Sequence, residues 1–229
     1  MFKHRSYQPE LLDAEYIPKE DLYQNLRELD FINTWLGGHD ITVKGIKKLI
    51  TKSYSDSISI ADVGCGGGDN LKAIANWSRK NGVFVRLIGI DIKDNCIHFA
   101  KENCKDYPEI TFIQSDYRLV NQHFDIILSA LFCHHLNDDQ MVEYLSWCQK
   151  YSDIGFLIND LERNPLAYHS IKILTSLFSK SYLVKNDAPL SVARGFKRSE
   201  IEFHMKKASI PSYLIRWMWA FRYLIIAKK

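Results

Sequence analysis

The chain of 229 residues lacks the cysteine pattern of a disulfide-stabilised or zinc-binding domain. It has five cysteines, an odd number, and no two of them are separated by just two residues. Such a set disfavours a disulfide framework and a cysteine zinc site. Free thiols suit a reducing compartment. We therefore predict a cytoplasmic protein without a bound metal.

Long apolar runs and clusters of like charge are also missing. The most apolar stretch, residues 213–227, is interrupted by Arg216 and Arg222, so we expect no membrane-spanning segment. The net charge of +3 is spread along the chain, which argues against a nucleic-acid partner. Because 46% of the residues are apolar, the chain can build one full core. We expect a single α/β domain.

Glycine is scarce, yet four of the 11 glycines fall between positions 64 and 68. They join a strand-like apolar run, residues 58–63, to a helix-like run that begins at Asp69. Without a Cβ atom, Gly64, Gly66 and Gly68 let the backbone approach a ligand, and the following helix offers unpaired N–H groups. This arrangement indicates a nucleotide-type cofactor site.

Two common cofactor motifs do not fit this loop. The dinucleotide fingerprint needs a third glycine where Asp69 stands, and its carboxylate would repel a pyrophosphate. A phosphate-binding P-loop needs Gly-Lys-Ser/Thr, which is absent here. The loop instead reads D-x-G-x-G-x-G with acidic residues on both sides, which favours a positively charged ligand. S-adenosylmethionine, with its sulfonium and ammonium groups, is such a ligand.

Residues 61–70 resemble motif I of the class I S-adenosylmethionine-dependent methyltransferases, and three further strand ends follow in the family's order up to residue 160. The resemblance implies that Asp91 accepts the ribose hydroxyls and that Asp116 meets the adenine amino group. Asp62 would act indirectly, by orienting loop amides or through water, and Tyr117 would flank the adenine unless it is only an exposed helix start. The cofactor residues implied are Asp62, Gly64, Cys65, Gly66, Gly68, Asp91, Ile92, Asp116, Tyr117 and Ser129.

The resemblance also implies a Rossmann-like sheet of seven strands, mostly parallel, with an antiparallel last strand. We predict an N-terminal helical cap over residues 1–55, with helices at 19–35 and 41–52, and a cofactor-binding core over 56–160 whose fifth strand spans 154–158. A helical lid would occupy 163–196. Residues 197–229 would hold a helix at 199–207 and a strand pair at 212–216 and 221–227.

Two histidines, His134 and His135, follow the fourth predicted strand and are the best base candidates. A phenol has a pKa near 10, so a neutral imidazole within hydrogen-bond reach would help to form the nucleophile. The alternative is that these loop histidines only shape the cofactor pocket. Positioning alone can then supply most of the acceleration, because the sulfonium is already a good leaving group.

The acceptor site is expected near the ends of the fifth and sixth strands. Trp217 and Trp219 stand where a hairpin turn should carry Gly, Asn or Asp. Together with Tyr168 in the apolar lid they predict a pocket for an aromatic or lipid-like acceptor. Arg163 would hold an acidic or phenolate group, or else pair with Glu162 or Asp160 as scaffolding. The alternative for the two Trp rings is that they pack under the lid helix and do not line the pocket.

The runs 159–165 and 187–196 resemble ubiquinone-methyltransferase-like bacterial enzymes that act on small molecules, some of them associated with polyketide synthases. We therefore predict methyl transfer to a small apolar or aromatic acceptor, first of all a phenolic hydroxyl. The alternatives are carbon or nitrogen methylation of a quinone or amine, a non-catalytic cofactor-binding protein, and membrane association through the apolar lid. The oligomeric state stays open.

Overall fold

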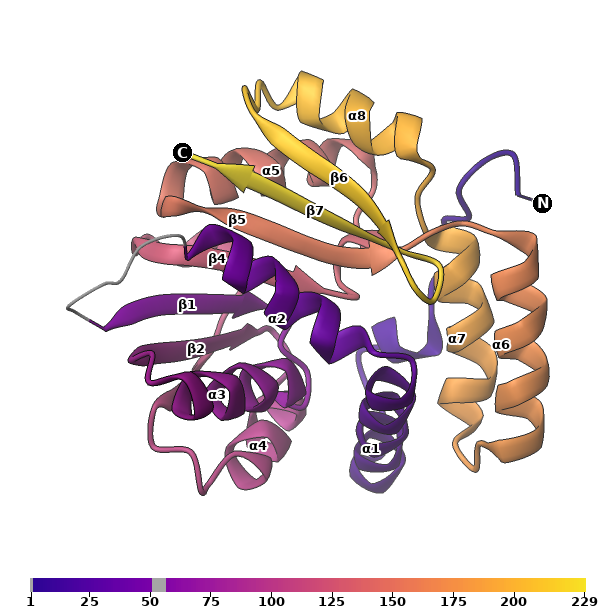
Figure 1. The fold of residues 1–229 in the computed structure, drawn as a ribbon. Helices are drawn as coiled ribbons and strands as arrows, with labels where there is room; N and C mark the ends of the chain where they lie inside the picture. The colour runs from indigo at the N-terminus through magenta and orange to yellow at the C-terminus, as the bar shows by residue number, and fades with distance from the viewer. Residues whose placement is uncertain (1, 51–56) are drawn as a thin grey trace.

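Seven strands form one sheet in the order β3-β2-β1-β4-β5-β7-β6 (Figure 1). The strands of this computed structural model, which describes residues 2–50 and 57–229, are β1 (Ile58–Val63), β2 (Val85–Asp91), β3 (Ile110–Gln114), β4 (Phe124–Ala130), β5 (Ser152–Leu161), β6 (Tyr213–Met218) and β7 (Arg222–Lys228). The first five are parallel to one another. Strand β7 lies antiparallel between β5 and β6, which confirms the predicted fold class.

Helices cover both faces of the sheet. One core contains apolar side chains from α2 (Gly38–Leu49), α3 (Asp69–Asn81) and α4 (Asp94–Asn103). The core on the opposite face is formed with α5 (Asp138–Tyr151) and α8 (Arg198–Lys207). All six residues of β1 are buried, as expected for a central strand covered on both sides. None of the helices in the described part of the chain could cross a membrane.

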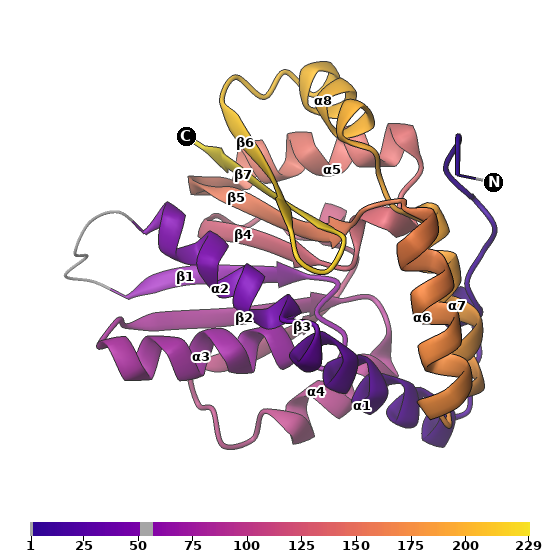
Figure 2. The ribbon, with the colours of Figure 1, turned by 45° about the vertical axis from the view of Figure 1, so that its right-hand side comes forward.

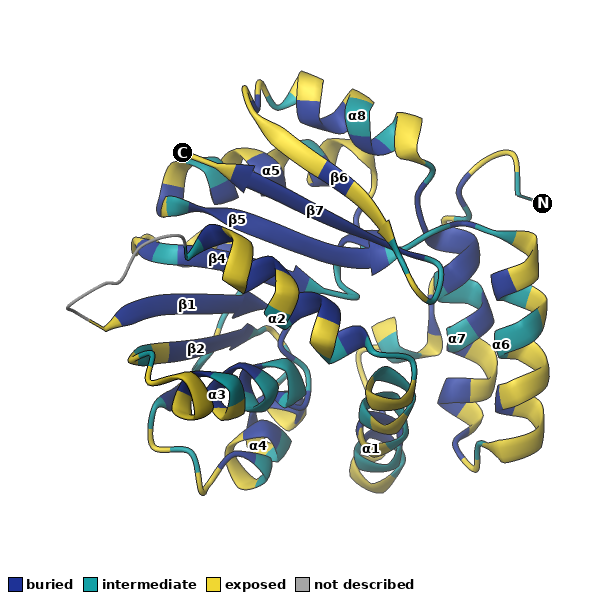
Figure 3. Ribbon diagram, viewed as in Figure 1, coloured by how far each residue is buried: buried dark blue, intermediate teal, exposed yellow. Residues whose placement is uncertain are grey.

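Three further helices stand at the edge of the sheet where the parallel strands end. They are α1 (Lys19–Trp35), α6 (Pro165–Phe178) and α7 (Tyr182–Arg194), the last two standing side by side (Figures 1 and 2). The insertion after β5 is thus a helical pair. Its outer helix, α6, exposes most of its surface (Figure 3). Short 3-10 turns complete this edge: η1 (Leu11–Asp13), η2 (Tyr117–Leu119) and η3 (Cys133–His135).

Several helices and strands begin or end at other residues than predicted. Helix α2 begins at Gly38 rather than at residue 41, directly after the left-handed Gly37 with φ 71°, and the predicted residues 51 and 52 lie outside the described part. Strand β5 is longer than predicted because it pairs over most of its length with both β4 and β7. The last hairpin turns at residues 219–221, where Phe221 adopts a φ of 53°. Trp217 therefore belongs to β6 and not to the turn.

The close approach of β5 and β7 requires a glycine at position 155. Gly155 has a φ of 151°, and a Cβ there would lie 2.2 Å from the carbonyl oxygen of Ala227. We expect Gly155→Ala to lower the free energy of unfolding by at least about 2 kcal/mol, because backbone must move. The matched control is Gly82→Ala, where a Cβ meets nothing within 4 Å. Urea unfolding of both variants checks this, and equal losses would contradict it.

Candidate functional site

The carboxyl ends of β1, β2 and β4 border a cavity of about 350 Å³. Its lining contains seven of the predicted cofactor residues, namely Gly64, Cys65, Gly66, Asp91, Ile92, Asp116 and Tyr117. Three others do not line it. Asp62, Gly68 and Ser129 lie behind the first layer of side chains, where Asp62 and Ser129 are buried almost completely.

The glycine loop has backbone angles that favour glycine. Gly64, Gly66 and Gly68 have φ values of 71°, 51° and 79°. A Cβ on Gly64 would lie 2.4 Å from Phe132, and one on Gly68 would lie 2.8 Å from the Cys104 thiol. At Gly66 the nearest protein atom is 3.7 Å away. Packing therefore requires the outer two glycines, whereas Gly66 leaves open space beside the cavity.

Asp91 connects this loop to the second strand. One carboxylate oxygen accepts the backbone N–H of Gly66 at 3.0 Å, and the other accepts that of Lys93 at 2.9 Å. Burial raises the pKa of Asp91. A carboxylate has about four acceptor sites, so both oxygens can still accept hydroxyl groups from a ligand in the cavity.

Asp116 and Tyr117 occupy the end of β3. Asp116 accepts the backbone N–H of Arg118 at 2.9 Å and pairs with its guanidinium. Tyr117 is buried against Tyr144 and Trp147, with ring centroids 5.2 and 5.3 Å apart, and burial raises its pKa. Tyr117 is thus part of the core as well as of the cavity wall.

A second cavity of about 310 Å³ adjoins the first. Its walls come mainly from apolar side chains of α1, α6, α7 and the last hairpin, among them Leu29, Ile171, Leu174, Val192 and Trp219. The two cavities share Leu12, Leu29, Asn33, Leu131 and His135. A molecule in the apolar cavity would therefore meet a cofactor in the first cavity at this boundary.

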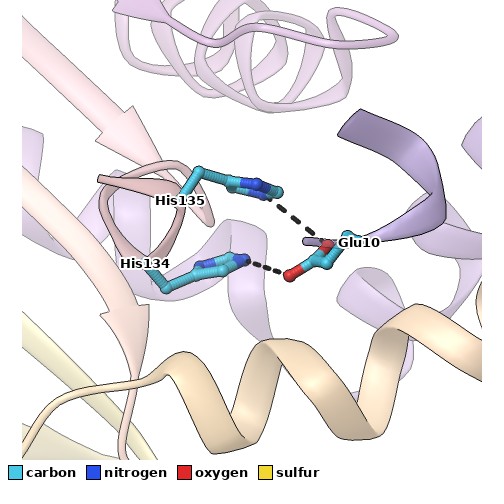
Figure 4. Close-up of side chains that lie close together, drawn as sticks. All are labelled: Glu10, His134 and His135. Atoms are coloured by element: carbon cyan, nitrogen blue, oxygen red, sulfur yellow. Dashed lines mark ion pairs between the residues drawn. The ribbon is translucent and has the colours of Figure 1, made fainter. Parts of the chain in front are cut away.

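Both predicted histidines line the second cavity. The Nδ1 atom of the buried His134 lies 2.8 Å from the Asp160 carboxylate, and that of His135 lies 3.0 Å from Asp13. Although burial acts to raise the pKa of Asp160, the neighbouring His134 lowers it. Both imidazoles therefore turn their Nε2 atoms toward Glu10, at 3.6 and 3.8 Å (Figure 4).

Three of the four predicted acceptor residues lie elsewhere. The buried Arg163 pairs with Glu200 at 2.7 Å and donates to the carbonyl of Gly195, so it is scaffolding, although its partner is neither Glu162 nor Asp160. Tyr168 packs edge-on against Phe2 and faces a different surface cleft. Trp217 donates to Glu162 at 2.9 Å. Neither cavity is lined by these three, and Trp219 is the predicted residue that reaches the second one.

The sequence analysis missed two residues of the second cavity, one from the N-terminal segment and one from β7. Glu10 is 5% exposed and lies in the second cavity, where burial raises its pKa to about 7. Arg222, also buried, lines the same cavity and donates to Asn33 at 2.7 Å. No local motif marks either residue. Glu10 is brought to the histidines by contacts between segments more than 120 residues apart.

Residues 60–153 match a family model described as a methyltransferase domain. Among solved structures, the plantazolicin methyltransferase in complex with SAH has a TM-score of 0.66 at 19% identity, covering 92% of this chain and 95% of that one. Human N-acetylserotonin methyltransferase in complex with SAM has a TM-score of 0.68 at 18% identity, covering 99% and 63%. No curated protein matches the chain in sequence.

A further methyltransferase of similar size supports the fold. A SAM-dependent methyltransferase from Aquifex aeolicus has a TM-score of 0.63 at 15% identity, covering 90% of this chain and 97% of that one. These likenesses show that the chain has the Rossmann-like methyltransferase fold. The likeness extends beyond residues 60–153, because the comparison with N-acetylserotonin methyltransferase covers 99% of this chain.

Asp62 is buried near the end of β1, just before the glycine loop. Neither of its carboxylate oxygens has a hydrogen-bond partner among the described residues. Burial raises its pKa well above the ordinary value, and the nearby Asp91 and Asp69 act in the same direction. In the folded state this group therefore keeps its proton at pH values where the unfolded chain has lost it.

This proton makes the stability depend on pH in a defined direction. Above the unfolded pKa of about 3.9, the free energy of unfolding falls as the pH rises toward the raised folded pKa. Asp62→Asn cannot titrate, so we expect its melting temperature relative to the wild type to increase between pH 4 and pH 8. Calorimetry measures this, with the exposed Asp106→Asn as control. A difference that does not vary with pH would contradict the prediction.

Proposed function

We propose that the protein transfers a methyl group from S-adenosylmethionine, its cofactor, to the hydroxyl of a small, largely apolar acceptor, first of all a phenol. The observation that carries this proposal is the pair of adjoining cavities, one bordered by the glycine loop and its acids and the other by apolar side chains. A donor and an acceptor in these two cavities would meet beside Leu131 and His135.

The first cavity supports S-adenosylmethionine by its charge and shape. Asp91 accepts from the loop and has capacity left for ribose hydroxyls, while the gap beside Gly66 leaves room for the ligand. Asp69 and Asp91 line this cavity beside the loop, which suits a cationic ligand and disfavours a pyrophosphate.

We further propose that His134 and His135 promote the loss of the acceptor's proton. Asp160 and Asp13 hold the two Nδ1 atoms, which fixes both rings with Nε2 toward the acceptor cavity. Holding the acceptor oxygen in line with the methyl–sulfur bond supplies a large part of the remaining acceleration. An amine acceptor would need less help with its proton, so this histidine pair favours a hydroxyl.

The acceptor that we propose is a small molecule. The runs 159–165 and 187–196 support membership of the ubiquinone-methyltransferase-like group. Structural neighbours named for N-acetylserotonin and for pyocyanin biosynthesis support an aromatic acceptor. A cytoplasmic location, with no nucleic-acid partner, is part of the same proposal. Binding of S-adenosylmethionine without transfer to any phenol, quinone or amine would instead favour a non-catalytic binding protein.

The cofactor assignment is tested by calorimetry. We expect saturable binding of S-adenosylhomocysteine and no binding of NAD. Asp91→Ala should weaken binding by about 1 to 3 kcal/mol, because ligand hydroxyls lose a charged acceptor. Asp106→Ala, an exposed change on another loop, should bind like the wild type. NAD binding without a response to S-adenosylhomocysteine would overturn the proposal.

The acceptor assignment is tested by steady-state kinetics with a panel of phenols. Trp219→Ala should raise the acceptor KM while leaving cofactor affinity nearly unchanged, because Trp219 lines the second cavity and not the first. Trp217→Ala, on the same hairpin but outside both cavities, is the matched control. If Trp219→Ala lowers only the melting temperature, the ring is part of the core and does not contact the acceptor.

The role of the histidines has a separate test. We expect His134→Ala to lower kcat for a phenol by about a hundredfold, the lower end of what removal of a proton-transfer group produces. His123→Ala, on an exposed loop, should leave kcat unchanged. A loss of less than about threefold would show that positioning alone carries the reaction.

A further inference from the structure

Glu10, His134 and His135 converge in the second cavity, and no hydrogen bond joins any two of these side chains. Asp160 and Asp13 contact the Nδ1 atoms of His134 and His135, so each ring in its neutral form presents the lone pair of Nε2 toward the carboxylate of Glu10 (Figure 4). These ligand atoms all lie within 4.8 Å of one another. Lone pairs that face one another in a buried site repel unless a positive charge lies between them.

The distances are too long for hydrogen bonds. Nε2 of His134 lies 3.6 Å from one Glu10 oxygen, and Nε2 of His135 lies 3.8 Å from the other. Hydrogen bonds of this kind span about 2.7 to 3.2 Å. Two ligands of a tetrahedral zinc ion, each about 2.1 Å from the metal, are about 3.4 Å apart. The observed separations are thus close to those across a bound metal ion.

We propose that Glu10, His134 and His135 bind a divalent transition-metal ion, Zn²⁺ in the first place, with one position open to the acceptor cavity. Two imidazoles and one carboxylate with an open position are a ligand set of catalytic zinc sites. The sequence analysis predicted no metal because it considered cysteine spacing. These ligands come instead from the residue that precedes η1 and from η3, which are distant in sequence.

The surroundings support this assignment. In metal sites the second ring nitrogen of a ligating histidine commonly donates to a carboxylate, which fixes the tautomer and strengthens the ligand. Asp160 and Asp13 provide this contact for the two histidines, at 2.8 and 3.0 Å. Each ring is therefore already oriented as a ligand before any ion binds.

The charge balance also allows a cation. Arg194 approaches Glu10 at 3.8 Å, but it also pairs with Asp13 at 3.2 Å and donates to the backbone of the histidine turn. The carboxylates of Glu10, Asp13 and Asp160 thus outnumber the guanidinium groups of Arg194 and of Arg222, which lines the same cavity. Ser191 donates to one Glu10 oxygen at 2.8 Å and so fixes the carboxylate in place.

This inference rests on the proposed function and specifies how the two histidines act there, as metal ligands rather than as proton acceptors. An acceptor hydroxyl at the open position would lose its proton to solvent water more readily, because a bound cation lowers its pKa. Its oxygen would then attack the methyl carbon while the carbon–sulfur bond breaks and leaves its electron pair on sulfur.

The test measures zinc directly, on the full chain with any purification tag removed. After treatment with a chelator, addition of Zn²⁺ and gel filtration, elemental analysis should find one zinc per chain. Competition titrations with a chromophoric chelator should show that Glu10→Gln and His135→Ala weaken zinc binding by at least about a hundredfold, and Asp13→Asn by about tenfold to a hundredfold. His123→Ala, which alters an exposed histidine, should bind zinc like the wild type.

Two results would overturn the metal site. One is a wild-type zinc content no higher than that of Glu10→Gln, with circular dichroism showing that both proteins are folded. The other is full methyl transfer by the zinc-free protein. In both cases cofactor binding and methyl transfer would still stand, so the proposed function would survive. Conversely, zinc binding without transfer to any acceptor would count against the proposed function alone.

Discussion

The parallel pairing of β1, β2, β4 and β5 is the constraint on which the site depends. Because these strands run in the same direction, their carboxyl ends meet at one edge of the sheet, and every polar residue that follows a strand is brought there. The glycine loop, Asp91 and the histidine turn reach this edge from three different strands. The antiparallel β7 adds the last hairpin to the same edge, where the two cavities share one boundary.

Sheet pairing alone does not complete the acceptor cavity, because Glu10 and Asp13 come from the N-terminal segment. Asp187 of α7 accepts the backbone N–H groups of Leu11 and Leu12, both at 2.9 Å, and Arg194 holds the carbonyl of Gln8 at 2.8 Å. These partly buried contacts hold the segment against α7. Glu10 and Asp13 therefore reach the second cavity only when α7 is folded, so Asp187 and Arg194 of this helix help to assemble the site.

Local sequence signals predicted the fold and most of the residues that line the first cavity, but few of those that line the second cavity. The spacing of glycines and acids at strand ends predicted that Gly64, Gly66 and Asp91 lie together. All three line the first cavity, because the loop after β1 and the end of β2 are neighbours in one β–α–β unit. Arg163 and Trp217 were predicted to face the acceptor from their place near strand ends. Which way a side chain turns depends, however, on distant partners such as Glu200, which no nearby sequence reveals. The same reason left Glu10 unnoticed.

The backbone is strained at Leu131, on the boundary between the two cavities. Leu131 lines both cavities and has a φ of 55°, which is unfavourable for a residue with a Cβ by about 1 to 2 kcal/mol. Its N–H donates to the carbonyl of Asn159 at 3.0 Å, which ties the turn after β4 to β5. This tie turns the chain sharply enough to place His134 and His135 beside the cofactor cavity. Strain of this kind persists where the surrounding structure fixes it, and here it does so at the point where methyl transfer would take place.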